Sequence, residues 1–175
     1  MGSRAVVVLP VRWSDVDLFG HVNNAAFLRF LDDARFAAFP GMGVDDAGEI
    51  SESVLVVVKH EIDYLAPVRF TSEPLAVEVW VSRVGTSSVD FGYEIGAVAA
   101  DGPGGDGPMG AGVGTDGTDA EARPGAGGPA ATPFLRALSR MVQIDRSTGR
   151  PRPFDDAQRE VFAAHTDEPP PLRGW

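Results

Sequence analysis

Residues 12–24, which read RWSDVDLFGHVNN, gather two aspartates, one histidine and two adjacent asparagines. Apolar side chains then repeat at helical spacing over residues 25–39, so the polar stretch lies directly before a predicted helix. A carboxylate or imidazole in that position could act as a general acid or base. The unpaired backbone N–H groups at a helix start could bind an oxygen that becomes negative. The spacing therefore indicates a candidate site for acid–base chemistry at the start of the predicted helix.

The composition excludes several classes of protein. The chain has 175 residues, which fits one ordinary domain, and its 25 acids against 15 bases give a formal charge of −10. An acidic chain repels phosphate backbones, so we expect no nucleic-acid partner. Cysteine is absent and only three histidines are present, so we expect no disulfide and no metal site. Residues 1–13 have the pattern of neither a signal peptide nor a membrane span, and we expect a cytoplasmic location.

The remaining pattern predicts a sheet around the helix. The helix is apolar over most of its circumference, so it must be covered on several sides. β-Branched or alternating apolar runs predict strands at residues 5–13, 53–65, 75–83, 87–97 and 134–145, and a short helix is predicted at 157–164. The third and fourth of these strands are joined by a short link, which indicates an antiparallel hairpin. The predicted fold class is α+β, with an antiparallel sheet of about five strands wrapped around one long central helix.

Residues 99–133 differ from the rest of the chain because they are rich in glycine and poor in large apolar side chains. Such a segment buries too little apolar surface to offset its ordering entropy, so we predict a flexible insertion. Residues 102–107 and 112–117 match the letters of a dinucleotide-binding loop, but neither stretch follows a predicted strand or opens a helix. We attribute both matches to the glycine content. The last residues, 166–175, predict an irregular tail.

The string RWSDVDLFGHVNNAAFLRFLDDAR resembles the signature of hot-dog fold thioesterases, in particular the 4-hydroxybenzoyl-CoA thioesterase-like family. IDYLAPVRF resembles the second strand of that family, and IDRSTGRPRPF resembles the close of its last strand. The resemblance covers about residues 6–98 and 134–162. It implies one hot-dog domain over residues 1–175 and an acyl-CoA thioesterase with no cofactor beyond the coenzyme A of its substrate. It also implies a homodimer or dimer of dimers that joins sheets edge to edge, with the sites at the shared interface.

The resemblance implies a catalytic set of Asp17, His21 and Asn24, with Asp17 as general base or nucleophile and His21 orienting the acid or the water. The backbone amides around residues 22–25 would then polarise the thioester carbonyl. Related acyl-carrier-protein thioesterases have asparagine where this chain has Phe19, so their full catalytic set is not carried over. The predicted substrate-binding residues are Phe19, Gly20, Val22, Asn23 and Phe27.

Each of these residues also has a structural interpretation. Asp15 is expected to bond the amides of its own turn, and the same alternative stays open for Asp17. His21 could be structural, and Asn24 could simply cap the helix. Among the other polar residues, one of Asp32 and Asp33 is expected to pair with Arg35 or Arg29, and the alternative that it meets substrate across a dimer interface stays open. His60 is expected to be a satisfied core or interface histidine.

Two further groups could contact an acyl-CoA. Four arginines are candidates for its phosphates on charge alone, namely Arg69, Arg83, Arg136 and Arg140. An apolar site built from Trp13, Phe19, Phe27 and Trp80 would favour a hydrophobic or aromatic acyl group.

Two other functions stay open at this point. The chain has Thr71-Ser72-Glu73 where the family usually has a Gly-Asp turn, which motivates a non-catalytic acyl-thioester binding or assembly protein on the same fold. Asp15 and Asp17 could also begin a metal-dependent phosphatase motif. Such motifs require an apolar strand that ends directly at the first acid, and Trp13-Ser14 fits that requirement poorly.

Overall fold

The computed structural model describes residues 3–40, 51–98, 121–122 and 132–173. A short 3-10 helix, Trp13–Asp15, follows the first strand. The other elements are, in chain order, β1 (Ala5–Leu9), α1 (Asn24–Ala38), β2 (Ser53–Tyr64), β3 (Leu75–Val84), β4 (Ser88–Ala97), β5 (Glu121–Ala122), β6 (Leu135–Asp145) and α2 (Asp156–Ala164). None of the helices in these ranges is long and apolar enough to cross a bilayer.

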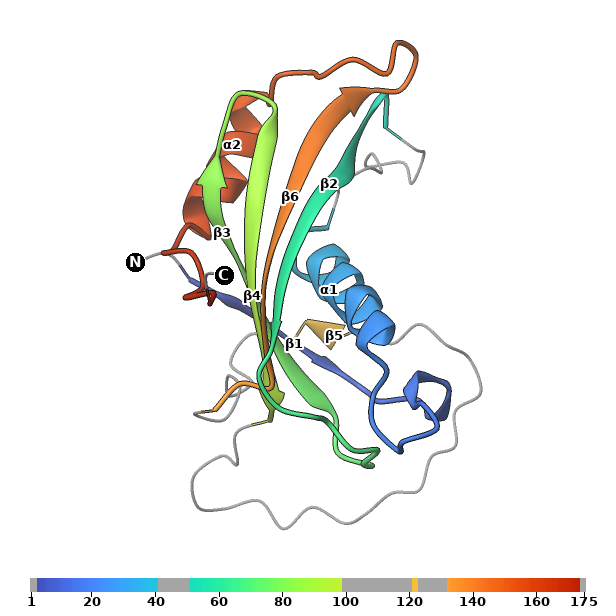
Figure 1. Cartoon of the computed structure of the whole chain (residues 1–175). Helices are drawn as coiled ribbons and strands as arrows, with labels where there is room; N and C mark the ends of the chain where they lie inside the picture. Colours follow the sequence, from blue (N-terminus) through green and yellow to red (C-terminus); the bar gives the residue numbers. More distant parts are fainter. Residues whose placement is uncertain (1–2, 41–50, 99–120, 123–131, 174–175) are drawn as a thin grey trace.

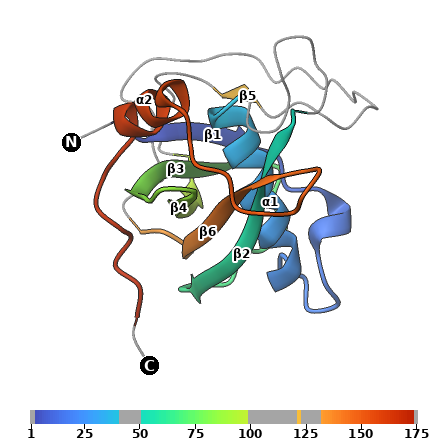
Figure 2. The same cartoon turned by 90° about the horizontal axis from the view of Figure 1, so that it is seen from above.

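The strands form one antiparallel sheet in the order β2-β6-β4-β3-β1-β5, and α1 packs against one face of it (Figure 1). The view from above shows α2 on the β1 and β3 side of the sheet (Figure 2). The predicted hairpin is confirmed, because β3 pairs with β4 in antiparallel register. A long helix held by a sheet of five main strands is the hot-dog arrangement, so the predicted fold class is confirmed.

Two predictions about strands need correction. The first strand ends at Leu9 rather than residue 13, because Pro10 has no N–H for the ladder and the chain then enters the 3-10 helix. Most of the predicted flexible insertion lies outside the described residues, as do both glycine-rich matches. Within it, Glu121 and Ala122 form β5 and pair with β1, a strand that the sequence pattern did not predict.

The long helix begins at Asn24, one residue earlier than a cap at Asn24 would allow. Asn23 is the N-cap: its backbone is extended, and its side-chain oxygen accepts a hydrogen bond from the Ala25 N–H at 2.8 Å. Asn24 is therefore the first helical residue, which leaves its side chain free of the capping role. The helix buries Phe27, Phe30 and Leu31 against the sheet, as the helical spacing predicts.

The sheet face beneath α1 is apolar and buried. Alternate residues on three strands face the helix, and each is almost fully inaccessible: Val77, Val79, Val81, Phe91, Tyr93, Ile95, Leu135 and Ala137. This alternation follows from the two-residue period of a strand. It fixes the register of the sheet, because a slip by one residue would expose the whole set.

Most polar side-chain groups between α1 and the sheet are paired, and among the described residues the Arg35 Nε is a buried exception without a hydrogen-bond partner. Arg35 is 1% exposed, donates to the Tyr93 hydroxyl at 2.9 Å and forms an ion pair with Asp32, as predicted. His60 Nδ1 lies 2.8 Å from the Ser139 hydroxyl, so the prediction of a satisfied histidine is also confirmed. Such pairing is required because an unpaired buried polar group costs free energy.

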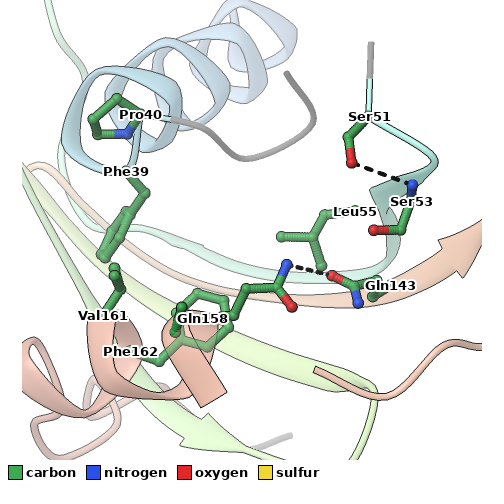
Figure 3. A pocket seen from close by; sticks show the side chains of 10 residues that line it. Phe39, Pro40, Ser51, Ser53, Leu55, Gln143, Gln158, Val161 and Phe162 are labelled. Atoms are coloured by element: carbon green, nitrogen blue, oxygen red, sulfur yellow. Dashed lines mark hydrogen bonds between the residues drawn. The ribbon is translucent and has the colours of Figure 1, made fainter. Parts of the chain in front are cut away.

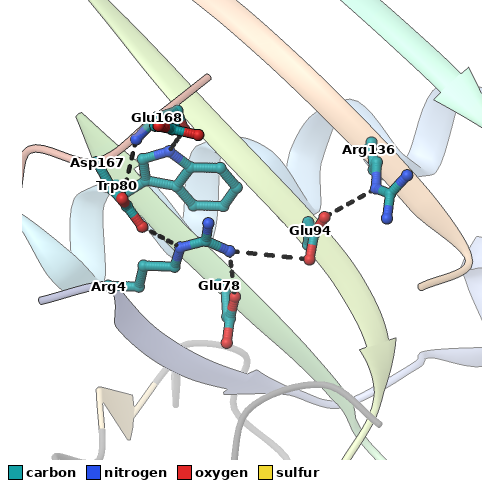
Figure 4. A network of polar contacts seen from close by, with 7 residues as sticks. All are labelled: Arg4, Glu78, Trp80, Glu94, Arg136, Asp167 and Glu168. Carbon is teal, nitrogen blue, oxygen red and sulfur yellow. Dashed lines mark hydrogen bonds and ion pairs between the residues drawn. The ribbon is translucent and has the colours of Figure 1, made fainter. Parts of the chain in front are cut away.

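The opposite face of the sheet carries a polar network around Arg4 and Trp80 (Figure 4). The Arg4 guanidinium lies 3.9 Å from the centre of a Trp80 ring and donates to Asp167 at 2.8 Å. The Trp80 indole N–H donates to the Glu168 carbonyl at 2.7 Å. Trp80 is therefore buried by the N-terminal strand and the C-terminal tail. The prediction that Trp80 lines an acyl site near Asp17 is wrong, because its side chain lies on the sheet face away from α1.

Candidate functional site

The loop before α1 is a small hairpin that places Asp17 opposite His21. Val16 pairs with Val22, the Asp17 N–H donates to the His21 carbonyl at 2.9 Å, and the Gly20 N–H donates to the Asp17 carbonyl at 3.1 Å. Gly20 closes the turn with a φ of 75°, in the left-handed region that favours glycine. This geometry keeps the carboxylate of Asp17 next to the start of the helix.

The Asp17 carboxylate has one occupied oxygen and one open oxygen. Oδ1 accepts hydrogen bonds from the backbone N–H groups of Phe19 at 2.8 Å and His21 at 3.3 Å. The structural interpretation of Asp17 is therefore partly correct, since the carboxylate braces its own turn. Within the described residues, Oδ2 has no hydrogen-bond partner. One oxygen thus remains available to a water molecule or a substrate.

Among the four backbone N–H groups of residues 22–25, at the helix start, some are also hydrogen-bonded and one is free. Three of the four are used internally: Val22 N–H donates to the Val68 carbonyl at 2.7 Å, Asn23 N–H to the Asp15 carbonyl at 2.7 Å, and Ala25 N–H to the Asn23 side chain. The Asn24 N–H has no partner in the part of the chain that the structure describes. A single free donor at the positive end of the helix dipole is a place for a carbonyl oxygen.

Asp15 has a structural role. It is 1% exposed, accepts from the Arg12 N–H at 2.8 Å and forms an ion pair with Arg29 of α1. These contacts join the 3-10 helix to the long helix, as the bond from Asn23 to the Asp15 carbonyl also does. The expectation that Asp15 serves its own turn is confirmed.

Two open hollows meet at Asp17 and Asn24. The first, of about 950 Å³, is bordered by the exposed tip of the hairpin and is here called the aromatic hollow. The second, of about 400 Å³, lies between the helix start and the residues after β2, and is called the strand hollow. Both volumes are in the range of small-molecule sites. The eight predicted site residues all border them: Phe19, Gly20 and Asn23 the aromatic hollow; His21, Val22 and Phe27 the strand hollow; Asp17 and Asn24 both.

The structure adds two aromatic residues that the sequence pattern did not single out. Phe70 borders the aromatic hollow, and its ring meets that of Trp13 edge to face at 5.4 Å between centroids. Tyr64 borders the strand hollow, packs against Phe27 and donates its hydroxyl to the Asn24 carbonyl at 3.0 Å. Burial raises the pKa of Tyr64, which keeps that hydroxyl protonated as a donor. Both residues lie in the string IDYLAPVRF, but the sequence pattern does not show that the chain after β2 passes beside the Asp17 loop.

A third hollow, of about 200 Å³, lies at the other end of α1, between β2, β6 and α2 (Figure 3). Phe39, Leu55 and Phe162 supply apolar walls, and the Gln158 amide donates to the Gln143 side chain at 2.7 Å. None of its lining residues is titratable, so it has no group for acid–base chemistry. The candidate site is therefore the pair of hollows at Asp17. Among the described residues, no group of three or more His, Asp and Glu side chains could hold a metal ion.

One antiparallel sheet around a long central helix, with a polar loop directly before that helix, places the chain in the class of hot-dog fold proteins. The family comparison agrees: the model of the thioesterase-like superfamily matches residues 11–162, and the chain belongs to that superfamily. The match does not distinguish a subfamily.

The individual relatives have low sequence identity to this chain. The uncharacterized protein YsmA of Bacillus subtilis (strain 168) is 32% identical over 85 residues, which are 49% of this chain and 56% of that protein, so the match spans about half the length of this curated relative. The PA5185 protein of Pseudomonas aeruginosa strain PAO1 has a similar fold, with a TM-score of 0.66 and 23% identity over 96% of this chain and 100% of that one. A thioesterase of Thermus thermophilus, complexed with coenzyme A and Zn, has a TM-score of 0.61 and 26% identity over 91% and 92% of the two chains.

Proposed function

We propose that this protein is a cytoplasmic acyl-CoA thioesterase, which hydrolyses an acyl thioester to the free acid and coenzyme A. One observation carries the proposal: Asp17, which has an open carboxylate oxygen, and Asn24, whose N–H has no partner among the described residues, border the same two hollows. The superfamily of the chain supports hydrolysis of a thioester. The coenzyme A in the Thermus thermophilus relative supports an acyl-CoA substrate.

In this proposal the thioester carbonyl accepts a hydrogen bond from the Asn24 N–H. Negative charge develops on that oxygen as the carbonyl is attacked, and the bond strengthens with the charge. The helix dipole acts in the same direction, because the N-terminus of α1 is its positive end. Removal of one donor of this kind costs about 10² to 10³ in rate in other enzymes.

Asp17 supplies the second component. As a general base, Oδ2 takes a proton from water while the water oxygen bonds to the carbonyl carbon; the C–S bond then breaks and the proton passes to the departing sulfur. As a nucleophile, Oδ2 itself bonds to the carbonyl carbon and expels the thiolate, and water then cleaves the resulting anhydride. Both routes use the same open oxygen. His21, which borders the strand hollow beside Asp17, orients the attacking water.

The aromatic hollow is the proposed site of the acyl group. We propose that the acyl group is hydrophobic or aromatic and lies in the aromatic hollow, where Trp13 is 76% exposed and Phe19 is 84% exposed. Contiguous exposed apolar side chains often mark a ligand-binding surface. Among the described residues, Asp17 is the only charged one that borders this hollow, so an acyl group with its own carboxylate would be repelled.

The proposed enzyme is a homodimer, or a dimer of dimers, joined through β2. This strand is one edge of the sheet, so its outer N–H and C=O groups are available to a second copy. Val57 and Val58 on this strand are exposed, and so is Phe36 on α1. Light scattering on the eluted protein should give a multiple of the 18.5 kDa chain mass; a single-chain mass at micromolar concentration would contradict the dimer.

The decisive experiment measures free-thiol release from short, medium, long and aromatic acyl-CoAs. Asp17→Asn keeps an oxygen that can brace the turn but removes the base, so we expect a loss of about 10² to 10⁴ in kcat. Asp156→Asn, in the first turn of α2, is the matched control and should retain activity. If the native protein and Asp17→Asn release thiol at equal rates, the assigned role of Asp17 is wrong.

A non-catalytic acyl-thioester binding protein is the second candidate. It is favoured by the two hydrogen bonds that tie Asp17 Oδ1 to its own turn, since a purely structural aspartate would make the same contacts. Tight binding of an acyl-CoA without any thiol release would favour this candidate over the enzyme.

A further inference from the structure

The position of the coenzyme A phosphates is a separate question from the chemistry at Asp17. Four arginines have suitable charge, and the sequence alone offers no choice between them. The structure separates them by two criteria: whether a carboxylate already neutralises the guanidinium, and where the residue lies relative to the two hollows.

Two of the four are already paired on the sheet face away from α1. Arg136 donates to Glu94 at 2.8 Å, as Figure 4 shows, and Arg140 donates through two nitrogens to Asp90 at 2.7 Å each. A two-pronged contact with a carboxylate uses the same donors that a phosphate would need. Neither arginine borders the hollows at Asp17.

The third, Arg83, is unpaired but distant. It is exposed, and no carboxylate contacts it among the described residues. It lies near the end of β3, whereas the segment beside the Asp17 loop precedes the start of that strand. Eight residues of extended chain separate Arg83 from Leu75, which is roughly 25 Å at the usual rise of a strand.

Arg69 is unpaired and adjacent to the site. Residues 68–70 run antiparallel to residues 20–22: His21 pairs with Arg69, and the Phe70 N–H donates to the Gly20 carbonyl at 3.4 Å. Arg69 is exposed and has no carboxylate partner in the described ranges. It does not border either hollow, so it lies beside the thioester position rather than in it.

A second exposed arginine adjoins the same aromatic pair in the chain. Arg12 precedes Trp13, and the ring of Trp13 contacts that of Phe70, which follows Arg69. The Arg12 side chain is exposed and, in the structure as described, faces no carboxylate. Two exposed arginines without a carboxylate partner among the described residues are therefore the chain neighbours of the two aromatic residues that border the aromatic hollow.

We infer that Arg69, assisted by Arg12, binds the phosphate groups of coenzyme A. The inference rests on the proposed function, because it takes the thioester to lie between Asp17 and Asn24. The phosphates are separated from the sulfur by the pantetheine arm, so their cations must lie near the hollows but outside them. A chain with a formal charge of −10 repels a phosphate-rich ligand, and unpaired arginines at this position offset that repulsion locally. Guanidinium groups also match phosphate oxygens in geometry.

The test is calorimetric binding of coenzyme A, 4′-phosphopantetheine and pantetheine to the native full-length protein and three variants. Arg69→Gln should weaken coenzyme A binding about tenfold or more, and Arg12→Gln by a smaller factor, while pantetheine binding changes less than about twofold. Arg83→Gln is the matched control: it removes the same charge from an exposed, unpaired arginine and should leave the affinity for coenzyme A unchanged.

Several outcomes would overturn the inference. Equal weakening by Arg69→Gln and Arg83→Gln would mean that only net charge matters. Equal affinity of the native protein for coenzyme A and pantetheine would mean that no phosphate is bound. Equal affinity for coenzyme A and 4′-phosphopantetheine would point to a carrier-protein substrate instead.

Thiol release from the same variants separates this inference from the proposed function. If Arg69→Gln hydrolyses acyl-CoA with an unchanged KM while Asp17→Asn is inactive, the enzyme assignment holds and the phosphate assignment fails. If coenzyme A binding depends on Arg69 but no thioester is hydrolysed, the phosphate assignment holds and the enzyme assignment fails.

Discussion

Asp17 and Asn24 are the two described residues that border both hollows of the candidate site. One contributes an open carboxylate oxygen from the hairpin, and the other contributes a free N–H from the first position of α1. The pairing depends on Asn23, whose side chain caps the helix and so leaves the amide of its neighbour unused. Because Asn23 caps the helix and Asn24 supplies the free N–H, the role of the Asn24 N–H can be tested separately from the cap.

Asn24→Pro should remove the proposed donor while the helix stays intact. Proline is favoured at the first helical position, and Asn23 before it has the extended backbone, with ψ at 137°, that a following proline requires. We expect kcat to fall about 10² to 10³. Asn24→Ala keeps the N–H and should retain most activity, with both variants monitored by circular dichroism. Full activity in the folded proline variant would exclude the Asn24 amide as the donor.

Gly20→Ala should affect both stability and activity. An added Cβ at Gly20 meets no heavy atom within 4 Å, so the cost comes only from the positive φ and is about 1–2 kcal/mol. The strain should shift the hairpin and with it Asp17. Gly149 also has a positive φ and open space around it, but it lies in the turn after β6. Gly149→Ala should therefore lose similar stability in urea unfolding without a change in kcat.

Asp15→Asn should destabilise the fold. The change removes the charge that pairs with Arg29 and buries an amide group without a matched partner. Because Arg29 is partly exposed, we expect less than the roughly 3–5 kcal/mol typical of a broken buried pair, about 2 kcal/mol in the free energy of unfolding. Glu52→Gln breaks the exposed pair with Arg152 and should cost less than about 0.5 kcal/mol. Equal effects of the two changes would show that Asp15 is not a structural anchor.

Gly92→Ala tests the packing of Trp80. A Cβ at Gly92 would lie 2.5 Å from the nearest atom of the Trp80 ring, so one of the two must move. Overpacking of this kind costs about 1–3 kcal/mol in the free energy of unfolding. The double variant Gly92→Ala with Trp80→Leu should lose less stability than the sum of the single variants, because the smaller side chain makes room. Simple additivity in denaturant titrations would argue against this contact.

His60 should contribute to the pH dependence of stability. Burial lowers the pKa of His60; the nearby Asp32 carboxylate raises it and the Arg35 guanidinium lowers it further. The unfolded chain therefore binds a proton more readily, and the stability from neutral His60 is present above the ordinary value of about 6.5 and lost as pH falls through the lower folded pKa. His60→Gln should flatten the decline in thermal stability between pH 7 and pH 5. Parallel curves for the two proteins would contradict this role.

Much of this protein can be predicted from local sequence patterns. The helix at residues 25–39 and the strands at 53–65 and 134–145 follow from apolar periodicity, which depends only on neighbouring residues. The loop at 15–24 is identifiable for the same reason, because its polar residues are contiguous and directly precede the helix. The resemblance to hot-dog thioesterases rests mainly on that one continuous string.

Contacts between distant segments are decided only by the tertiary structure. Tyr64 and Phe70 reach the site because residues 64–70 cross beside the hairpin, and no local pattern signals that crossing. Trp80 alternates onto the sheet face away from α1, so a large aromatic residue that suggested an acyl site packs on Arg4 instead. The choice of Arg69 over Arg136 likewise depends on which guanidinium meets a carboxylate across the sheet. Periodicity specifies the elements, whereas the register and crossing of strands far apart in sequence determine which side chains share a site.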